Sequence, residues 1–176
     1  MLKQDRIEDR TLSETIIKNS YSAEDTYQIG YQLAANAKPG DVFCLIGDLG
    51  VGKTVFSQGF GAGLGIEEPI NSPTFTIVQV YDEGRLPFYH FDVYRIADED
   101  ELFEIGFEEM TDGDGVSLIE WANLIPGSLP EHYTEILIEK ELEQGFDYRK
   151  VSITGGMSDE DIGNGQFRTG SICSDY

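Results

Sequence analysis

Residues 47–54, Gly-Asp-Leu-Gly-Val-Gly-Lys-Thr, fit the phosphate-binding P-loop pattern G-x-x-x-x-G-K-S/T and so restrict the fold strongly. The apolar run 41–46 before them predicts a short buried strand, and residues 53–64 predict a helix whose late glycines favour an early end. Glycines let backbone N–H groups turn toward a phosphate, and the helix N-terminus adds partial positive charge at the same point. Strand, loop and helix in this order predict a site for a nucleoside triphosphate.

The motif assigns roles to the residues of this loop. Lys53 is expected to reach the β- and γ-phosphates, and the Thr54 hydroxyl is expected to bind Mg²⁺. The predicted nucleotide-binding residues are Asp48, Leu49, Gly50, Val51, Gly52, Lys53, Thr54 and Val55.

A P-loop enzyme also needs an acid that holds Mg²⁺ or its water, at the end of an apolar strand beside the loop. Glu120 ends the run Val-Ser-Leu-Ile and Asp92 ends Phe-Tyr-His-Phe, so both are candidate metal-site and catalytic residues. The alternative for each is an acid that faces solvent or caps a helix. Thr74, in Ser-Pro-Thr after the P-loop helix, lies where many P-loop proteins place a loop that senses the γ-phosphate, although this sequence is also a common turn.

Charge and apolar content argue against several classes of partner. The chain has 33 acidic and 12 basic residues, a net charge of −21, whereas nucleic-acid binding needs Lys and Arg to neutralise phosphates. Direct DNA binding is therefore not expected, and any link to RNA should run through another protein. No apolar run approaches the ~18 residues of a membrane span, and residues 1–10 lack the apolar stretch of a secretory signal. Cys44 and Cys173 are isolated thiols that fit a reducing cytosol, so the expected location is cytoplasmic.

Turn residues and composition predict one folded domain, residues 15–155, between a flexible segment, 1–14, and a disordered tail, 156–176, that is rich in Gly, Ser, Asp and Asn. Two β-rich runs around a Gly-containing turn, 75–81 and 86–92, predict an antiparallel hairpin. The predicted fold class is α/β, a P-loop NTPase-type sheet flanked by helices, with this hairpin inserted. The other expected elements are an edge strand at 15–19, a helix from Ser22 to the stop at 38–40, an acidic helix at 99–105, and strands at 116–119, 134–139 and 149–154.

Three further side chains allow two interpretations each. His90 lies inside a predicted strand, and a packed or hydrogen-bonded core histidine is favoured over a catalytic one. Arg95 is expected to pair with the acidic segment 97–115 rather than to reach phosphate. Trp121, the only tryptophan, is expected to pack in or beside the core rather than to stack on a base.

Four sequence blocks in this order give the chain a family resemblance. They are Gly-Asp-Leu-Gly-Val-Gly-Lys-Thr, Asn-Ser-Pro-Thr-Phe, His-Phe-Asp-Val-Tyr-Arg and Ile-Glu-Trp. Over about residues 15–155 the chain resembles the TsaE (YjeE) family, the bacterial ATPases of tRNA threonylcarbamoyladenosine synthesis. The Asp-Leu-Gly within the P-loop and the His-Phe-Asp-Val-Tyr-Arg block are more specific than the P-loop itself. The resemblance marks residues 15–155 as a P-loop ATPase domain, and the tail has no counterpart in it.

The resemblance implies ATP and Mg²⁺ as cofactors, slow ATP hydrolysis, and the partner proteins TsaB and TsaD, which modify adenosine 37 of tRNA. On this chain it implies phosphate and Mg²⁺ ligation by Lys53 and Thr54, a switch-type threonine at Thr74, and a Walker B-like acid at Asp92. It also implies a metal-site acid at Glu120. Arg149 resembles an arginine that lies near the nucleotide. Contact with tRNA would be indirect, through the partner proteins.

Two other classes of P-loop protein remain as alternatives. A kinase that acts on a small molecule or a protein would share the loop and the acids but would need an acceptor pocket and usually a lid. No Arg-rich lid is visible, because only Arg85 and Arg95 are basic between Lys53 and Lys140. A GTP switch would need an Asn-Lys-x-Asp motif to read the base, and the chain has none.

Overall fold

The computed structural model describes residues 14–155, which contain one mixed sheet of seven strands in the order β1-β7-β6-β2-β5-β4-β3. Neighbours among β6, β2, β5 and β4 run parallel, and the outer pairings of β3 with β4, β7 with β6 and β1 with β7 are antiparallel. The strands are β1 (Thr15–Ser20), β2 (Val42–Ile46), β3 (Val78–Tyr81), β4 (Phe88–Asp92), β5 (Val116–Glu120), β6 (Thr134–Lys140) and β7 (Arg149–Thr154). The predicted fold class is confirmed, and the hairpin is β3–β4, which joins the main sheet because β4 also pairs with β5.

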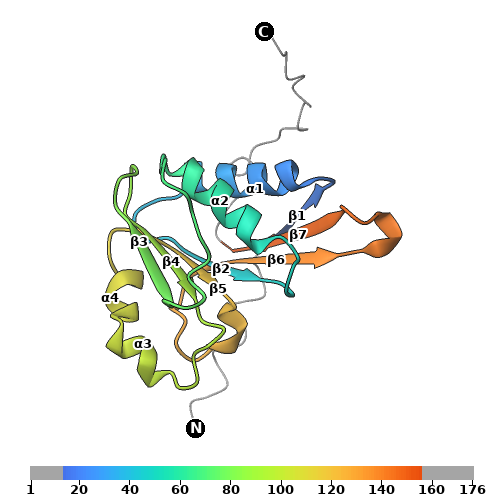
Figure 1. Ribbon diagram of the computed structural model, residues 1–176. Helices are drawn as coiled ribbons and strands as arrows, with labels where there is room; N and C mark the ends of the chain where they lie inside the picture. Colours follow the sequence, from blue (N-terminus) through green and yellow to red (C-terminus); the bar gives the residue numbers. More distant parts are fainter. Residues whose placement is uncertain (1–13, 156–176) are drawn as a thin grey trace.

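Two long helices, α1 (Ala23–Ala35) and α2 (Lys53–Gly63), lie side by side over one face of the sheet (Figure 1). The helix expected from Ser22 is α1, and Ser22 caps it, since its Oγ accepts a hydrogen bond from Asp25 N at 3.1 Å. The two helices pack so closely that a Cβ at Gly59 would collide with the Tyr27 carbonyl oxygen. This contact holds the middle of α2, the helix that follows the P-loop, closely against α1.

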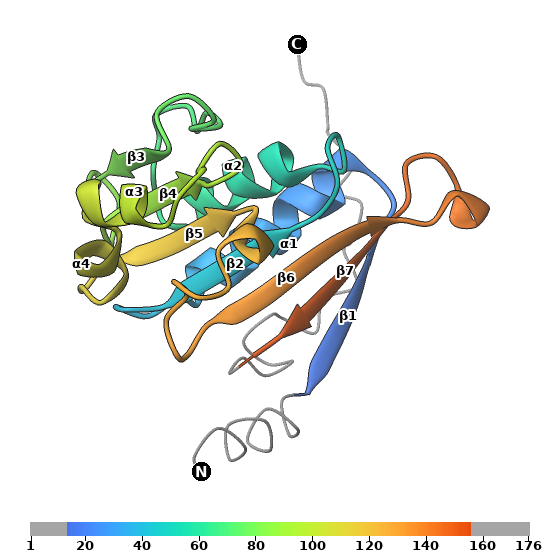
Figure 2. The same ribbon diagram turned by 90° about the horizontal axis from the view of Figure 1, so that it is seen from below.

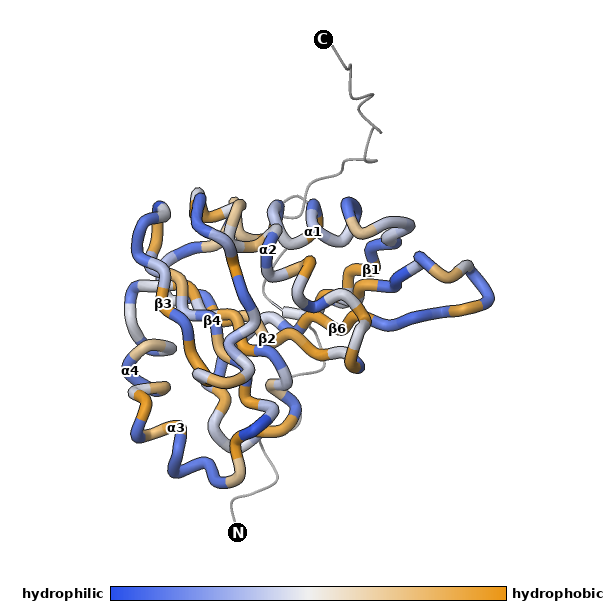
Figure 3. Tube along the Cα trace, in the orientation of Figure 1, coloured by the Kyte–Doolittle hydropathy of each residue, from blue (hydrophilic) through white to orange (hydrophobic). Residues whose placement is uncertain are grey.

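The opposite face carries α3 (Asp100–Glu104), α4 (Phe107–Thr111) and a short 3-10 helix, η1 (Ala122–Leu124), as the turned view in Figure 2 shows. Each face has its own apolar core, and the strands between them are the most hydrophobic part of the chain trace (Figure 3). All five residues of β5 are buried, as expected for a parallel strand that is covered on both faces. Helices on both sides therefore shield the strands whose ends carry the candidate site.

One predicted strand is shorter in the structure, and some elements of the structure were not predicted. Of the strand expected at 75–81, only β3 (Val78–Tyr81) forms, because the chain turns at the residues before it. Ile77 N donates to Pro73 O at 2.8 Å, and Ile77 has a left-handed φ of 67°. The helix expected at 99–105 is confirmed as α3, whereas α4, which begins after Gly106 with its φ of 77°, was not predicted. A second 3-10 helix, η2 (Leu142–Gln144), in the β6–β7 connection was also not predicted.

The predicted flexible ends, 1–14 and 156–176, lie outside the described residues apart from Glu14. Among the helices of residues 14–155, none is both long enough and apolar enough to cross a membrane.

Candidate nucleotide-binding site

The P-loop connects β2 to α2 and has the backbone that a phosphate cradle needs. Gly50 and Gly52 have φ values of 74° and 115°, a region that residues with a Cβ rarely adopt. Val51, between them, is buried and anchors the loop in the core under α1 and α2. No side chain caps the start of α2 at Gly52, so the first N–H groups of this helix are left for another acceptor. The loop is thus built to bind an anion at a helix N-terminus.

Lys53 lies at the centre of this arrangement. Its Nζ donates to the P-loop carbonyls of Gly47 at 2.6 Å and Asp48 at 2.9 Å. Burial lowers the pKa of Lys53 from its ordinary value, and the nearby carboxylates of Glu120, Asp92 and Asp48 act in the opposite direction. The sequence-predicted lysine and both predicted strand-end acids are therefore brought together electrostatically.

Glu120 ends β5 and is buried, with 3% of its surface exposed. Its Oε1 lies 2.9 Å from Ser57 Oγ and 3.3 Å from His90 Nε2. Burial alone would raise the pKa of Glu120, but the hydrogen bonds and charges of His90, Ser57 and Lys53 outweigh it and hold this pKa below its usual value. The side chain is accordingly a carboxylate at neutral pH and not a solvent-facing acid.

Asp92 ends β4 and ties the loop before β3 to the site. Its Oδ2 accepts hydrogen bonds from Thr74 Oγ1 at 3.1 Å and, more weakly, from Ser72 Oγ at 3.4 Å, while Oδ1 accepts one from Tyr94 N at 3.0 Å. Asp92 is 3% exposed, and Thr74 is half-buried. The predicted switch-type threonine and the predicted Walker B-like acid are therefore in direct contact.

The other predicted ligands lie along the same loop and helix. Thr54 is exposed in the first turn of α2, beside Lys53 in the chain, and Val55 is half-buried. Asp48, Leu49 and Gly50 form the exposed rim of the loop. Within residues 14–155 no group of three or more His, Cys, Asp or Glu side chains forms a ready-made metal cage. Two acids with a threonine nonetheless suit Mg²⁺, which keeps several waters and uses one or two carboxylates together with substrate phosphates.

Arg149 is the first residue of β7, which is separated from β2 by β6, and its side chain reaches the P-loop. Its Nε donates to Val51 O at 2.8 Å, and its Nη1 donates to the carbonyls of Phe146 at 2.9 Å and Tyr148 at 2.8 Å. The guanidinium thus holds the P-loop backbone to the β6–β7 connection. Its predicted contact with the nucleotide itself stays a prediction.

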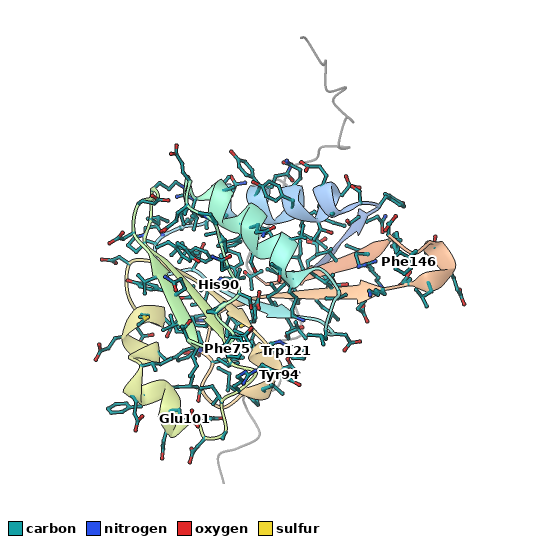
Figure 4. The ribbon with its side chains drawn as sticks, in the orientation of Figure 1. Phe75, His90, Tyr94, Glu101, Trp121 and Phe146 are labelled. Atoms are coloured by element: carbon teal, nitrogen blue, oxygen red, sulfur yellow. The ribbon has the colours of Figure 1, made fainter. Side chains whose placement is uncertain are left out.

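One aromatic ring, that of Trp121, lies against the ammonium group of Lys53. Lys53 Nζ lies 4.2 Å from the Trp121 ring centroid, and the Tyr94 and Trp121 rings are 4.8 Å apart. Figure 4 shows Phe75, Tyr94 and Trp121 gathered at the same end of the sheet. Arg95 lies over the Phe75 ring at 4.5 Å, so the structure places it there and not against the acidic segment 97–115. Trp121 is half-buried beside the site, in line with the predicted packing role.

Sequence reasoning missed Ser57 as a site residue and did not connect His90 to Glu120. His90 is fully buried and hydrogen-bonded, which confirms the core histidine that was predicted, yet its partner is a site acid. The signals were available: His90 and Asp92 alternate along β4 and share a face, and Ser57 is one helical turn after Lys53. Neither pattern indicates how close His90 or Ser57 lies to Glu120, because Glu120 is on a separate strand, β5.

Comparison with known proteins shows which family shares these features. The family model described as threonylcarbamoyl adenosine biosynthesis protein TsaE matches residues 20–151. The chain belongs to the TsaE family. The match contains every predicted site residue, from Asp48 to Arg149. The resemblance stated from the four sequence blocks is therefore confirmed.

Individual relatives of this TsaE chain agree. The tRNA threonylcarbamoyladenosine biosynthesis protein TsaE of Bacillus subtilis is 50% identical over 131 residues, which cover 74% of this chain and 80% of the relative. The protein of the same description from Treponema pallidum is 45% identical over 117 residues, 66% of this chain and 86% of the relative. A crystal structure of Bacillus subtilis YdiB superimposes with a TM-score of 0.69 at 40% identity, covering 82% of this chain and 87% of that one.

Proposed function

We propose that this TsaE chain is a cytoplasmic Mg²⁺-dependent ATPase that binds and hydrolyses ATP to support threonylcarbamoylation of tRNA adenosine 37 by a partner TsaB–TsaD complex. One observation carries the ATPase proposal: the P-loop lysine, Lys53, lies within the electrostatic reach of Asp92 and Glu120, two buried acids on neighbouring strand ends. Family membership and the printed names of the relatives support the role in tRNA modification.

Binding would begin at the P-loop. Its backbone N–H groups, including those at the N-terminus of α2, would donate hydrogen bonds to the phosphates, and the Lys53 ammonium would leave the carbonyls of Gly47 and Asp48 to pair with them. Thr54, Asp92 and Glu120 would hold Mg²⁺, directly or through water. When bound, Mg²⁺ neutralises charge on the β- and γ-phosphates. Arg149 keeps the loop in shape by its bond to Val51 O.

Hydrolysis transfers the γ-phosphoryl group to water and releases ADP and phosphate. Glu120 is suited to orient that water, because its pKa is low enough for the carboxylate to accept a hydrogen bond at neutral pH. Asp92 already holds Thr74, so the loop that precedes β3 can follow changes at the γ-phosphate. Phosphoryl transfer depends mainly on positioning and on electrostatic stabilisation, so Glu120 need only orient the water and need not be a strong general base.

The charge of the chain bears on how it meets tRNA. A net charge of −21 disfavours direct contact with nucleic-acid phosphates, so the partner proteins would carry the tRNA contact. The ATPase would then act on the state of the TsaB–TsaD assembly.

The test is release of inorganic phosphate from ATP and from GTP, with and without Mg²⁺ and with and without purified TsaB–TsaD. We expect slow release from ATP alone, loss of activity when Mg²⁺ is chelated, and a change in rate when TsaB–TsaD is added. Phosphate transfer to a small molecule or protein in place of water would instead identify a kinase. Unchanged turnover with TsaB–TsaD, together with no binding to it, would contradict the proposed coupling.

A further inference from the structure

His90 is an unusual choice for a fully buried position in β4. The residue is 0% exposed, and its ring is stacked on Phe88 with centroids 5.7 Å apart and an interplanar angle of 11°. Within residues 14–155, Nδ1 of His90 is the one buried side-chain nitrogen or oxygen without a hydrogen-bond partner. An apolar ring would fill the same space without an unpaired nitrogen, so packing alone does not account for a histidine here.

The other ring nitrogen has a specific partner. His90 Nε2 lies 3.3 Å from Glu120 Oε1, and both side chains are almost completely buried. An ionised carboxylate only accepts hydrogen bonds, so in a hydrogen bond between these two groups Nε2 carries the proton. The unpaired Nδ1 is consistent with that arrangement, since a ring that donates from Nε2 leaves Nδ1 as an acceptor.

A second side chain, Ser57, reaches the same oxygen of Glu120, and its one hydroxyl proton is shared between this oxygen and Lys53 O, which lies 2.8 Å away. Ser57 Oγ, from α2, lies 2.9 Å from the same Oε1, which is therefore held from a strand on one side and from the P-loop helix on the other. No hydrogen bond to Glu120 Oε2 from any of the described residues accompanies them. The carboxylate is thus fixed at Oε1, and Oε2 is the oxygen left to act in the site.

We propose that His90 is a positioning residue for the hydrolytic reaction: its Nε2–H, together with the Ser57 hydroxyl, fixes Glu120 so that Oε2 faces the γ-phosphate end of the nucleotide site. This inference rests on the proposed ATPase function. His90 itself touches neither phosphate nor water, and its effect passes through Glu120. Loss of the His90 contact then allows Glu120 to rotate, which slows hydrolysis and leaves nucleotide binding by the P-loop unchanged.

Two substitutions separate the hydrogen bond from packing. His90→Phe keeps a ring on Phe88 but removes the donor, and His90→Gln keeps an N–H donor at similar reach. We expect kcat to fall ~10–100-fold in His90→Phe, the range found when a supporting hydrogen-bond partner is removed, with KM for ATP unchanged. His90→Gln should recover part of kcat. Circular dichroism and a thermal melt establish that each variant is folded. Equal kcat in wild type and folded His90→Phe would overturn the proposal.

A double-mutant cycle with Glu120→Gln tests whether His90 acts through Glu120. If it does, His90→Phe adds no further loss of kcat once Glu120 is already replaced. Independent losses that multiply in the double variant would assign His90 to some other role and overturn the proposal. If the wild-type protein had no ATPase activity, the proposed function would be wrong, and the kcat measurements could not be made.

A measurement that needs no nucleotide keeps the inference testable in that case. The ring ¹⁵N chemical shifts of His90, assigned with His90→Phe as the control, report which nitrogen carries the proton. We expect a protonated Nε2 whose signal moves in Ser57→Ala and in Glu120→Gln. A ring protonated at Nδ1 and free at Nε2 would overturn the proposal whatever the enzymatic result.

Discussion

Asp92 and Glu120 are direct partners in the parallel register of β4 and β5, and Glu120 is at the same time the partner of Leu45 in β2. The three residues therefore lie at one level across three neighbouring strands, two residues before the P-loop begins at Gly47. Trp121 N donates to Leu45 O at 3.1 Å, which continues this alignment into the loop. Carboxyl ends of parallel strands form the usual ligand-binding edge of an α/β sheet, and here that edge carries both acids.

This alignment predicts that each acid contributes to turnover. Glu120→Gln and Asp92→Asn should each lower kcat by ~10²-fold or more, which corresponds to about 2.7 kcal/mol of activation free energy. Phosphate release measured over a Mg²⁺ titration tests both variants. Glu139→Gln is a matched control, because Glu139 is an exposed strand acid on β6. Full activity of either variant at every Mg²⁺ concentration would make that acid purely structural.

Trp121 should report on the position of Lys53. The ammonium group lies 4.2 Å from the ring centroid, and the chain has no other tryptophan. Mg-ATP should draw Lys53 from the ring and from the loop carbonyls toward the phosphates, which changes the fluorescence. We expect the change to be absent in Lys53→Met. An unchanged spectrum at saturating Mg-ATP would mean that the lysine stays where it is.

Arg149 should matter for nucleotide affinity rather than for the chemical step. Its guanidinium bonds three main-chain carbonyls, one of them that of Val51 in the P-loop. Arg149→Ala should weaken ATP binding about tenfold, or about 1.4 kcal/mol, since the loop loses this support. Titration calorimetry measures the affinity, and Lys150→Ala is the control, because Lys150 pairs with Glu141 at 3.6 Å instead. If Arg149→Ala binds ATP with wild-type affinity, Arg149 does not support nucleotide binding.

Cys44 predicts a pH dependence of stability. Burial, with the charge of Glu135 second, raises the pKa of Cys44 from 9.0 to about 12. A raised pKa in the folded state contributes stability that is fully present below about pH 9 and is lost as the pH rises toward 12, because the unfolded chain releases its proton first. The free energy of unfolding from urea titrations should fall by up to ~1.4 kcal/mol per pH unit in this window.

Cys44→Ala, in a Cys173→Ser background, is the comparison for that experiment. It should flatten the alkaline slope while costing stability at every pH through lost packing. Parallel slopes with and without Cys44 would show that other groups cause the alkaline loss.

The sequence predicts the P-loop, its flanking strand and helix, and both strand-end acids, because each is encoded within a few consecutive residues. It does not predict contacts that depend on strand order. Arg149 reaches Val51 only because β7 returns beside β6, which neighbours β2. His90 meets Glu120 only because β4 and β5 share their register. The early turn before β3 depends on Ile77, whose positive φ no local pattern indicates.

Phosphate release from Mg-ATP by wild-type protein and by Lys53→Met decides whether this chain is a P-loop ATPase. Methionine fills the space of the lysine stem, so the fold should persist, as a thermal melt can verify. We expect slow but measurable hydrolysis by the wild type and none by Lys53→Met, because no other side chain of residues 47–54 carries a positive charge. Equal turnover by the two folded proteins would contradict this expectation.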